Sequence, residues 1–206
     1  MTKWSVYSEF EGEKLRRMHQ GRVRRLRGLL RLFTKVGLTA NMITVTSLVL
    51  GLLFIPTIIY SYPLAIFVLV FHCLLDGLDG PLATYQKKAS NQGMLLDFTA
   101  DLVGISSVII GLAITGYMDA ILASVFLALN TTILFYSLIQ TIMGVKQTFG
   151  FKPRWWIYGA VIGLYVVESV THIKINVIPA FTLLSCAVMV VCGTFDFLRI
   201  YRHANL

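Results

Sequence analysis

The chain has 206 residues, of which 56% are apolar and 14% are charged. Soluble domains carry about 25% charged residues, so this composition excludes an ordinary water-soluble domain and indicates an integral membrane protein. The net charge is +8. Because the basic residues lie close to apolar runs, they fit contact with anionic lipid better than contact with nucleic acid, and no nucleic-acid partner is expected.

A basic segment comes before the first apolar run. In residues 21–33, GRVRRLRGLLRLF, apolar side chains recur at helical spacing and arginines occupy much of the remaining circumference. This pattern predicts an amphipathic helix that lies at the membrane surface on anionic lipid. We therefore divide the chain into a cytoplasmic N-terminal segment, 1–36, and a transmembrane domain, 37–206.

Six apolar runs follow, each of about 20 residues and able to cross a hydrocarbon core of about 30 Å as a helix. They fall at 41–60, 64–83, 94–115, 120–143, 155–173 and 177–198. The expected fold is all-α, with six transmembrane helices in one bundle. Lys and Arg cluster before the first run, at alternate loops and after the last run. By the positive-inside rule, both termini are expected in the cytoplasm.

Four aspartates lie near the predicted cytoplasmic ends of the second and third spans. Asp76 and Asp79 are three residues apart, and Asp97 and Asp101 are four apart, so each pair shares one helical face. The short loop between the spans predicts antiparallel neighbouring helices. Such neighbours would bring all four carboxylates to a similar depth.

A charge at the centre of a bilayer costs about 2.5 to 3.5 kcal/mol on insertion scales, so the four carboxylates must be neutralised. These two spans contain no Lys or Arg, and His72 is their one titratable basic side chain. An all-oxygen cluster favours Mg²⁺ or Mn²⁺. Separate aspartates that cap helix ends are the simpler alternative. His72 either hydrogen-bonds to Asp76, one turn away, or packs as a neutral core residue.

The spacing of these residues matches a known pattern. Asp76-x2-Asp79-Gly80-x2-Ala83, followed by Gly93-x3-Asp97-x3-Asp101, resembles the signature of the CDP-alcohol phosphatidyltransferases, D-x2-D-G-x2-A-R-x8-12-G-x3-D-x3-D. One position departs, because Thr84 replaces the arginine of the motif. Upstream, residues 38–44, LTANMIT, resemble the L-T-P-N-x-x-T segment of the same family, with Ala40 in place of proline.

The resemblance implies an enzyme of phospholipid biosynthesis whose active site faces the cytoplasm. It would transfer a phosphatidyl or related phosphoalcohol group from a CDP-linked lipid donor to the hydroxyl of a small polar or phosphorylated alcohol, with release of CMP. It further implies a homodimer. Mg²⁺ or Mn²⁺ would be held by Asp76, Asp79, Asp97 and Asp101, and Asp101 would act as general base.

The resemblance also indicates which residues bind the substrates. The candidates for the donor nucleotide are Asn41, Thr44, Gly80, Ala83, Thr84, Gly93, Lys87 and Lys88. Since Thr84 has no charge, one of the two lysines could bind the phosphates, although solvated loop lysines are the simpler reading. The acceptor candidates are Lys146, Lys152, Arg154, Arg199 and Arg202. The positive-inside rule alone would also place cations at these positions.

Other readings of the sequence stay open. An inactive family relative that binds lipid or nucleotide would explain the loss of arginine at Thr84. A membrane prenyltransferase is disfavoured because its aspartate motifs lie far apart, and a cation transporter would need polar groups on the outer side. Gly159 and Gly163 suit a helix contact within the protein or across a dimer. An interfacial aromatic belt is predicted at Trp155, Trp156 and Tyr158.

Overall fold

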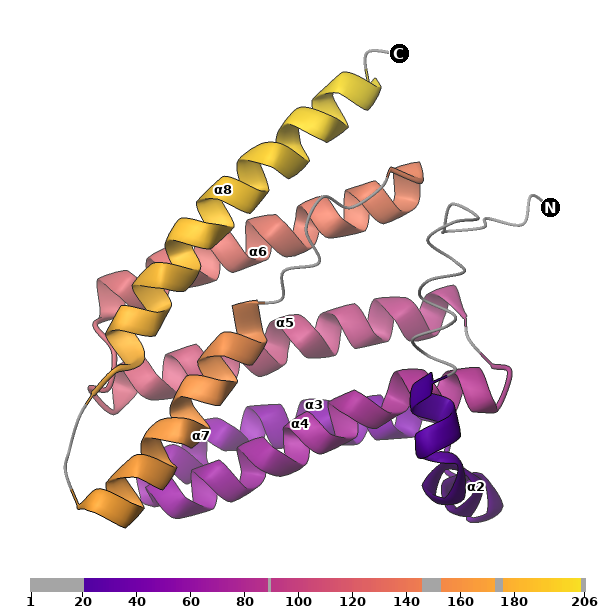
Figure 1. Ribbon diagram of the computed structural model, residues 1–206, viewed down its shortest axis with the longest axis horizontal. Helices are drawn as coiled ribbons and strands as arrows, with labels where there is room; N and C mark the ends of the chain where they lie inside the picture. Colours follow the sequence, from indigo (N-terminus) through magenta and orange to yellow (C-terminus); the bar gives the residue numbers. More distant parts are fainter. Residues whose placement is uncertain (1–20, 89, 146–152, 173–175, 205–206) are drawn as a thin grey trace.

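The computed structural model describes residues 21–88, 90–145, 153–172 and 176–204 (Figure 1). Regular structure in these ranges is helical, as the sequence predicts. The helices are α2 (Arg27–Lys35), α3 (Ala40–Tyr60), α4 (Tyr62–Tyr85), α5 (Asn91–Ile114), α6 (Ala120–Met143), α7 (Pro153–Thr171) and α8 (Ile178–Ala204).

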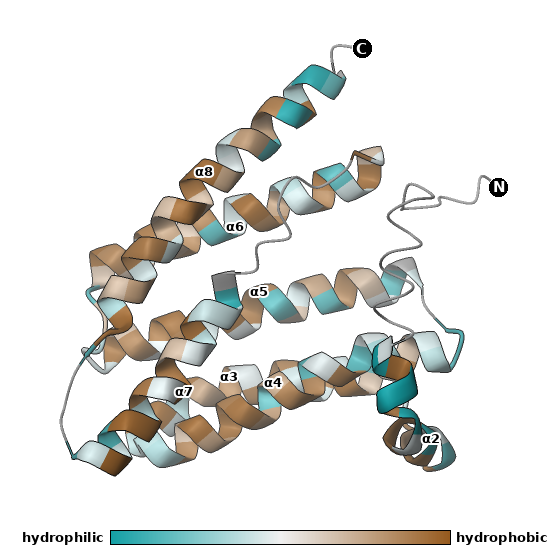
Figure 2. Cartoon of the chain, viewed as in Figure 1, coloured by the Kyte–Doolittle hydropathy of each residue, from teal (hydrophilic) through white to brown (hydrophobic). Residues whose placement is uncertain are grey.

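Five helices of the described chain are long and apolar enough to cross a membrane, namely α3, α4, α5, α6 and α8. Figure 2 shows apolar residues along these helices and hydrophilic residues around α2. The predicted span 155–173 corresponds to α7, which is not among the five. This helix has 19 residues and includes Arg154 and Glu168. The sixth crossing therefore stays a prediction, as does the cytoplasmic position of both termini.

Polar side chains fix where the helices begin. The hydroxyl of Thr39 accepts a hydrogen bond from the N–H of Met42 at the start of α3, and Ser90 does the same for Gly93 at the start of α5. Asp119 caps α6 through two backbone N–H groups. Such caps satisfy backbone donors that have no partner inside the helix. They set the ends of α3 and α5, where the signature residues lie.

Helix α3 packs against both α4 and α5, whereas α4 and α5 make little direct backbone contact with each other within the described chain. The two helices face each other through side chains instead, because His72 of α4 lies against Gly104 of α5. A close approach of α3 to α5 explains the arrangement: a Cβ placed on Gly51 would lie 3.1 Å from the Cα of Gly104. Two glycines at one crossing point allow backbones to approach closely.

His72 of α4 fills the space beside this crossing. Its side chain is 2% exposed. Nδ1 lies 2.9 Å from the carbonyl of Ser47 and donates to it, which leaves Nε2 to accept from the hydroxyl of Tyr158 at 3.3 Å. The packed alternative for His72 is thus the one observed. Tyr158 is also buried, so the predicted aromatic belt cannot include it, although Trp155 and Trp156 are exposed.

Helix α7 connects the two parts of the bundle, because it packs against α4 and also against α8, which pairs with α6. The hydroxyl of Tyr62 donates to the carbonyl of Val161 at 3.1 Å and holds α7 on α4. Gly159 and Gly163 have no described atom of the chain near the position of an added Cβ. They therefore make no close helix contact inside the described protein, and their role in a dimer stays a prediction.

The amphipathic segment packs partly on protein. The chain is helical at residues 21–25, turns at Leu26 and continues as α2. Leu30 is fully buried and forms a small apolar cluster with Ile43 of α3 and Leu82 of α4. Leu32 is 55% exposed. The segment therefore does not present its whole apolar face to lipid, because the ends of α3 and α4 cover part of it.

Candidate active site

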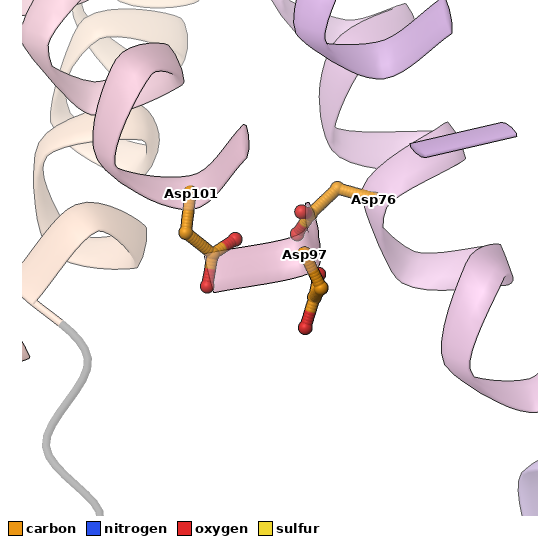
Figure 3. Close-up of side chains that lie close together, drawn as sticks. All are labelled: Asp76, Asp97 and Asp101. Carbon is orange, nitrogen blue, oxygen red and sulfur yellow. The ribbon is translucent and has the colours of Figure 1, made fainter. Parts of the chain in front are cut away.

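Three aspartates meet between α4 and α5 (Figure 3). Asp76 extends from α4, and Asp97 and Asp101 extend from α5, one turn apart. Each offers a carboxylate oxygen, and these oxygens all lie within 4.8 Å of one another. The side chains of Asp76 and Asp101 are only 7% and 11% exposed. Like charges are therefore held together with little water to screen them.

The size and composition of this cluster suit a divalent cation. All three groups are carboxylates, and hard oxygen ligands favour Mg²⁺ or Mn²⁺ over Zn²⁺. Ligands on opposite sides of Mg²⁺ are about 4.2 Å apart, since each bond is about 2.1 Å long. The carboxylate oxygens lie within 4.8 Å of one another, an upper bound close to that separation. The residues present fit the metal that the sequence predicts.

Asp79 lies beside the cluster in a different setting. It is 6% exposed. One carboxylate oxygen accepts a hydrogen bond from the hydroxyl of Thr44 at 2.8 Å, and the other accepts one from the N–H of Gly80 at 2.6 Å. Asp79 interacts electrostatically with Asp97 and Asp76. The predicted fourth ligand is therefore at the edge of the site, and Thr44 orients its carboxylate.

An arginine from α7 neutralises part of the negative charge. Nη2 of Arg154 lies 3.3 Å from Oδ2 of Asp76, and Nη1 forms a second ion pair with Asp101. Arg154 is 8% exposed, and its guanidinium also lies against the ring of Trp155, 5.6 Å from the centroid. We expected Arg154 only as an acceptor-binding cation. Its contact with the aspartates was missed because it depends on how α7 packs, which the spacing of residues along the chain does not reveal.

The two signature segments meet at the starts of α3 and α5. The side-chain oxygen of Asn41 lies 3.3 Å from the position that a Cβ would take at Gly93, and the hydroxyl of Ser90 is equally close. A side chain at residue 93 would crowd both groups, so glycine keeps Asn41 accessible; Asn41 is exposed. This adjacency brings together two residues that we expected at the donor nucleotide.

The remaining donor candidates line the last turns of α4 and the loop after it. Gly80 and Ala83 are partly buried, whereas Thr84 is exposed and its hydroxyl donates to the carbonyl of Gly80 at 3.0 Å. Lys87 and Lys88 follow the end of α4 and are exposed. No described contact joins either lysine to the aspartates.

The acceptor candidates divide into three groups. Arg154 contacts the aspartate cluster, as described above. Arg199 and Arg202 are exposed on α8. Lys146 and Lys152 lie outside the described residues. Of the acceptor candidates, Arg154 is thus the one for which the structure shows a contact with the aspartates.

Known proteins are similar to this chain in sequence profile and in fold. The sequence profile of CDP-alcohol phosphatidyltransferases matches residues 37–195, which include all the signature aspartates. No curated protein sequence matches the chain.

Two solved structures of the Mycobacterium tuberculosis phosphatidylinositol phosphate synthase PgsA1 are similar in fold. The one with CDP-DAG bound has a TM-score of 0.71 and 18% identity, over 86% of this chain and 94% of that chain. The one in complex with manganese and citrate has a TM-score of 0.70 and 20% identity, over 84% of this chain and 88% of that chain.

The profile match identifies the family, and it therefore argues against the prenyltransferase and the transporter. Manganese in the second mycobacterial structure agrees with the predicted Mg²⁺ or Mn²⁺. The expected all-helical membrane fold is likewise consistent with both structures. With its signature aspartates gathered on two apolar helices, the chain belongs to the CDP-alcohol phosphatidyltransferase family, whose enzymes depend on a divalent metal.

Proposed function

We propose that the protein transfers a phosphatidyl or related phosphoalcohol group from a CDP-linked lipid to an alcohol in phospholipid biosynthesis, and releases CMP. The observation that carries this proposal is the convergence of Asp76, Asp97 and Asp101 at the ends of two apolar helices. A CDP-linked lipid keeps its chains in the bilayer and its head at the surface. The active site would face the cytoplasm, in line with the distribution of Lys and Arg.

The residues around the cluster have distinct roles in this reaction. Asp76, Asp97 and Asp101 would hold the divalent cation, with Asp79 at the edge of the site. When bound, the cation screens the diphosphate from the carboxylates, polarises the phosphorus and stabilises the departing CMP. Asn41, which lies beside Gly93, offers an amide to the nucleotide.

Asp101 would accept the proton of the acceptor hydroxyl as general base. The acceptor oxygen then forms a bond to phosphorus, and the bond from phosphorus to the CMP oxygen breaks, so CMP leaves with the electron pair. The ion pair with Arg154 holds the carboxylate of Asp101 in position for this transfer.

A phosphorylated alcohol is the acceptor class that we favour. Because Arg154 contacts Asp101, a phosphate bound by this guanidinium would bring the hydroxyl of the same molecule close to the base. Arg199 and Arg202, together with Lys146 and Lys152, would supply further positive charge. The similarity in fold to a phosphatidylinositol phosphate synthase supports testing this class.

The test is release of CMP from CDP-diacylglycerol by the purified protein, with Mg²⁺ or Mn²⁺ and a panel of acceptors. The panel contains serine, choline, inositol, glycerol phosphate and inositol phosphate. We expect metal-dependent release with one of the phosphorylated acceptors. A wild type that binds no CDP-linked donor in the presence of metal would contradict the proposed function.

Asp101→Asn is the matched variant, since it keeps the shape of the side chain and removes the base. We expect turnover to fall at least about 10²-fold, while metal-dependent binding of CDP-diacylglycerol remains. Asp119→Asn, at the cap of α6, controls for a general effect of replacing a carboxylate. Turnover retained in Asp101→Asn would remove the assignment of Asp101 as general base.

A further inference from the structure

Pro81 leaves one backbone carbonyl of α4 without its helical partner. In an α-helix, the carbonyl of a residue accepts a hydrogen bond from the N–H four positions later. Pro81 lies inside α4 and has no N–H, so the carbonyl of Gly77 finds no such donor. Nη2 of Arg22 donates to this carbonyl at 3.0 Å. An arginine of the N-terminal segment is thereby fixed at the residue that directly follows Asp76.

Arg22 contacts the face of α4 that also carries position 84. At this position the family motif has an arginine, whereas this chain has Thr84. Gly77, Gly80 and Thr84 have the spacing that places residues on one face of a helix. The hydroxyl of Thr84 caps the carbonyl of Gly80, one turn beyond the contact of Arg22. Thr84 supplies no charge there. Since Gly77 and Gly80 have no side chains, a phosphate group can approach the backbone of this strip.

The charge of Arg22 remains available for a ligand. A guanidinium has five N–H donors, and the bond to Gly77 uses Nη2 on a neutral partner. Arg22 is exposed, and no carboxylate in the described ranges forms an ion pair with it. The charge of Arg154, by contrast, is already partly balanced by Asp76 and Asp101.

We propose that Arg22 binds the diphosphate of the CDP-linked donor and supplies the positive charge that position 84 lacks. This inference rests on the proposed function, because it takes a CDP-linked lipid as the donor. The contact with Gly77 holds the guanidinium one residue from Asp76 along α4. Arg22 would then bind the diphosphate close to the carboxylates that would hold the cation.

Arg22→Gln separates this role from a structural one. The glutamine amide can still donate to the carbonyl of Gly77, but it has no charge. We expect the Kd for soluble CDP and the Kd and KM for CDP-diacylglycerol to rise about tenfold or more, with little change in kcat and in affinity for cytidine. Arg24→Gln, an exposed neighbour in the same segment, is expected to behave like the wild type.

The double variant Arg22→Gln/Thr84→Arg tests whether charge is the cause. An arginine at position 84 lies on the same face of α4, so we expect it to restore most of the lost affinity for CDP. If the single variant binds CDP like the wild type, or if the double variant stays weak, the inference is overturned. Arg22→Lys, which keeps the charge, should retain most of the affinity and covers the case in which Arg22→Gln fails to fold.

The same measurements distinguish two kinds of failure. A wild type that neither binds nor turns over a CDP-linked donor contradicts the proposed function, and the role of Arg22 falls with it. A wild type that binds the donor and releases CMP, with affinities that do not depend on residue 22, overturns the role of Arg22 alone.

Discussion

Thr44 is joined to the candidate site through a hydrogen bond with another residue. Its hydroxyl also lies 3.1 Å from the carbonyl of Ala40, and it donates to Asp79 at 2.8 Å. Thr44 and Asp79 are both buried. A buried carboxylate needs hydrogen bonds to remain in one orientation, and groups that orient metal ligands affect metal affinity strongly. We therefore propose that Thr44 positions Asp79.

Thr44→Val tests this role, because it removes the hydroxyl and keeps the size of the side chain. We expect the concentration of Mg²⁺ or Mn²⁺ needed for half-maximal CMP release to rise about 10-fold or more, because Asp79 loses a hydrogen bond. Thr46→Val is the control, since Thr46 is exposed and bonds only to the carbonyl of Met42 in its own helix. If Thr44→Val instead weakens CDP binding and leaves the metal requirement unchanged, Thr44 is a nucleotide contact, as the sequence first indicated.

At the scale of whole elements, the α3–α5 crossing decides where the aspartates can meet. A Cβ on Gly104 would lie 2.8 Å from Cε1 and 2.9 Å from Nε2 of His72. The ring cannot easily move away, because Ser47 and Tyr158 hold both of its nitrogens. An added methyl group must therefore separate α5 from α3 and α4.

Gly104→Ala is expected to destabilise the protein by about 1–3 kcal/mol, the usual cost of overpacking a core. The variant should also need more metal for activity, because α5 carries Asp97 and Asp101. Thermal melting and metal titration in detergent measure the two effects. Gly28→Ala is the control, since nothing lies within 4 Å of a Cβ at that position. A melting temperature for Gly104→Ala equal to that of the control would show that the crossing tolerates a side chain.

The positions of the helices were predictable because each span is a long apolar run, and α3, α5 and α6 also begin at a polar cap. The predicted run 120–143 coincides with α6, and the run 41–60 differs from α3 by one residue. The pairing of helices was not predictable in the same way. A short loop between α4 and α5 suggested that they are neighbours, but small residues such as Gly51 and Gly104 let the backbone of α3 approach α5, and α4 meets α5 through side chains such as His72.

The sequence predicts those features of the candidate site that depend on the spacing of residues along one helix. The four-residue interval between Asp97 and Asp101 places both on one face of α5, and the family signature identified their partner Asp76 on α4. Contacts between segments that are far apart in the chain produce no pattern in the sequence that would predict them. Arg154 and Arg22 are two of many cations in the chain, and only packing shows which of them touch α4.

For the molecule as a whole, Arg154 joins the helices that surround the site. It is carried by α7, which also packs against α8, and it pairs with Asp76 of α4 and Asp101 of α5. Breaking a buried ion pair by removal of one partner costs about 3–5 kcal/mol, because it leaves charge without compensation. Arg154 and a divalent cation would both neutralise the same carboxylates.

Arg154→Gln should therefore lower the melting temperature in the presence of a chelator, by on the order of 10 °C. Mg²⁺ should raise the melting temperature of this variant more than that of the wild type, because the cation replaces the lost positive charge at Asp76 and Asp101. Arg202→Gln, at an exposed position of α8, is the matched control and should melt like the wild type. Equal stabilisation of the variant and the wild type by Mg²⁺ would mean that the metal does not share these carboxylates with Arg154. Asp76 and Asp101 would then no longer be assigned as its ligands.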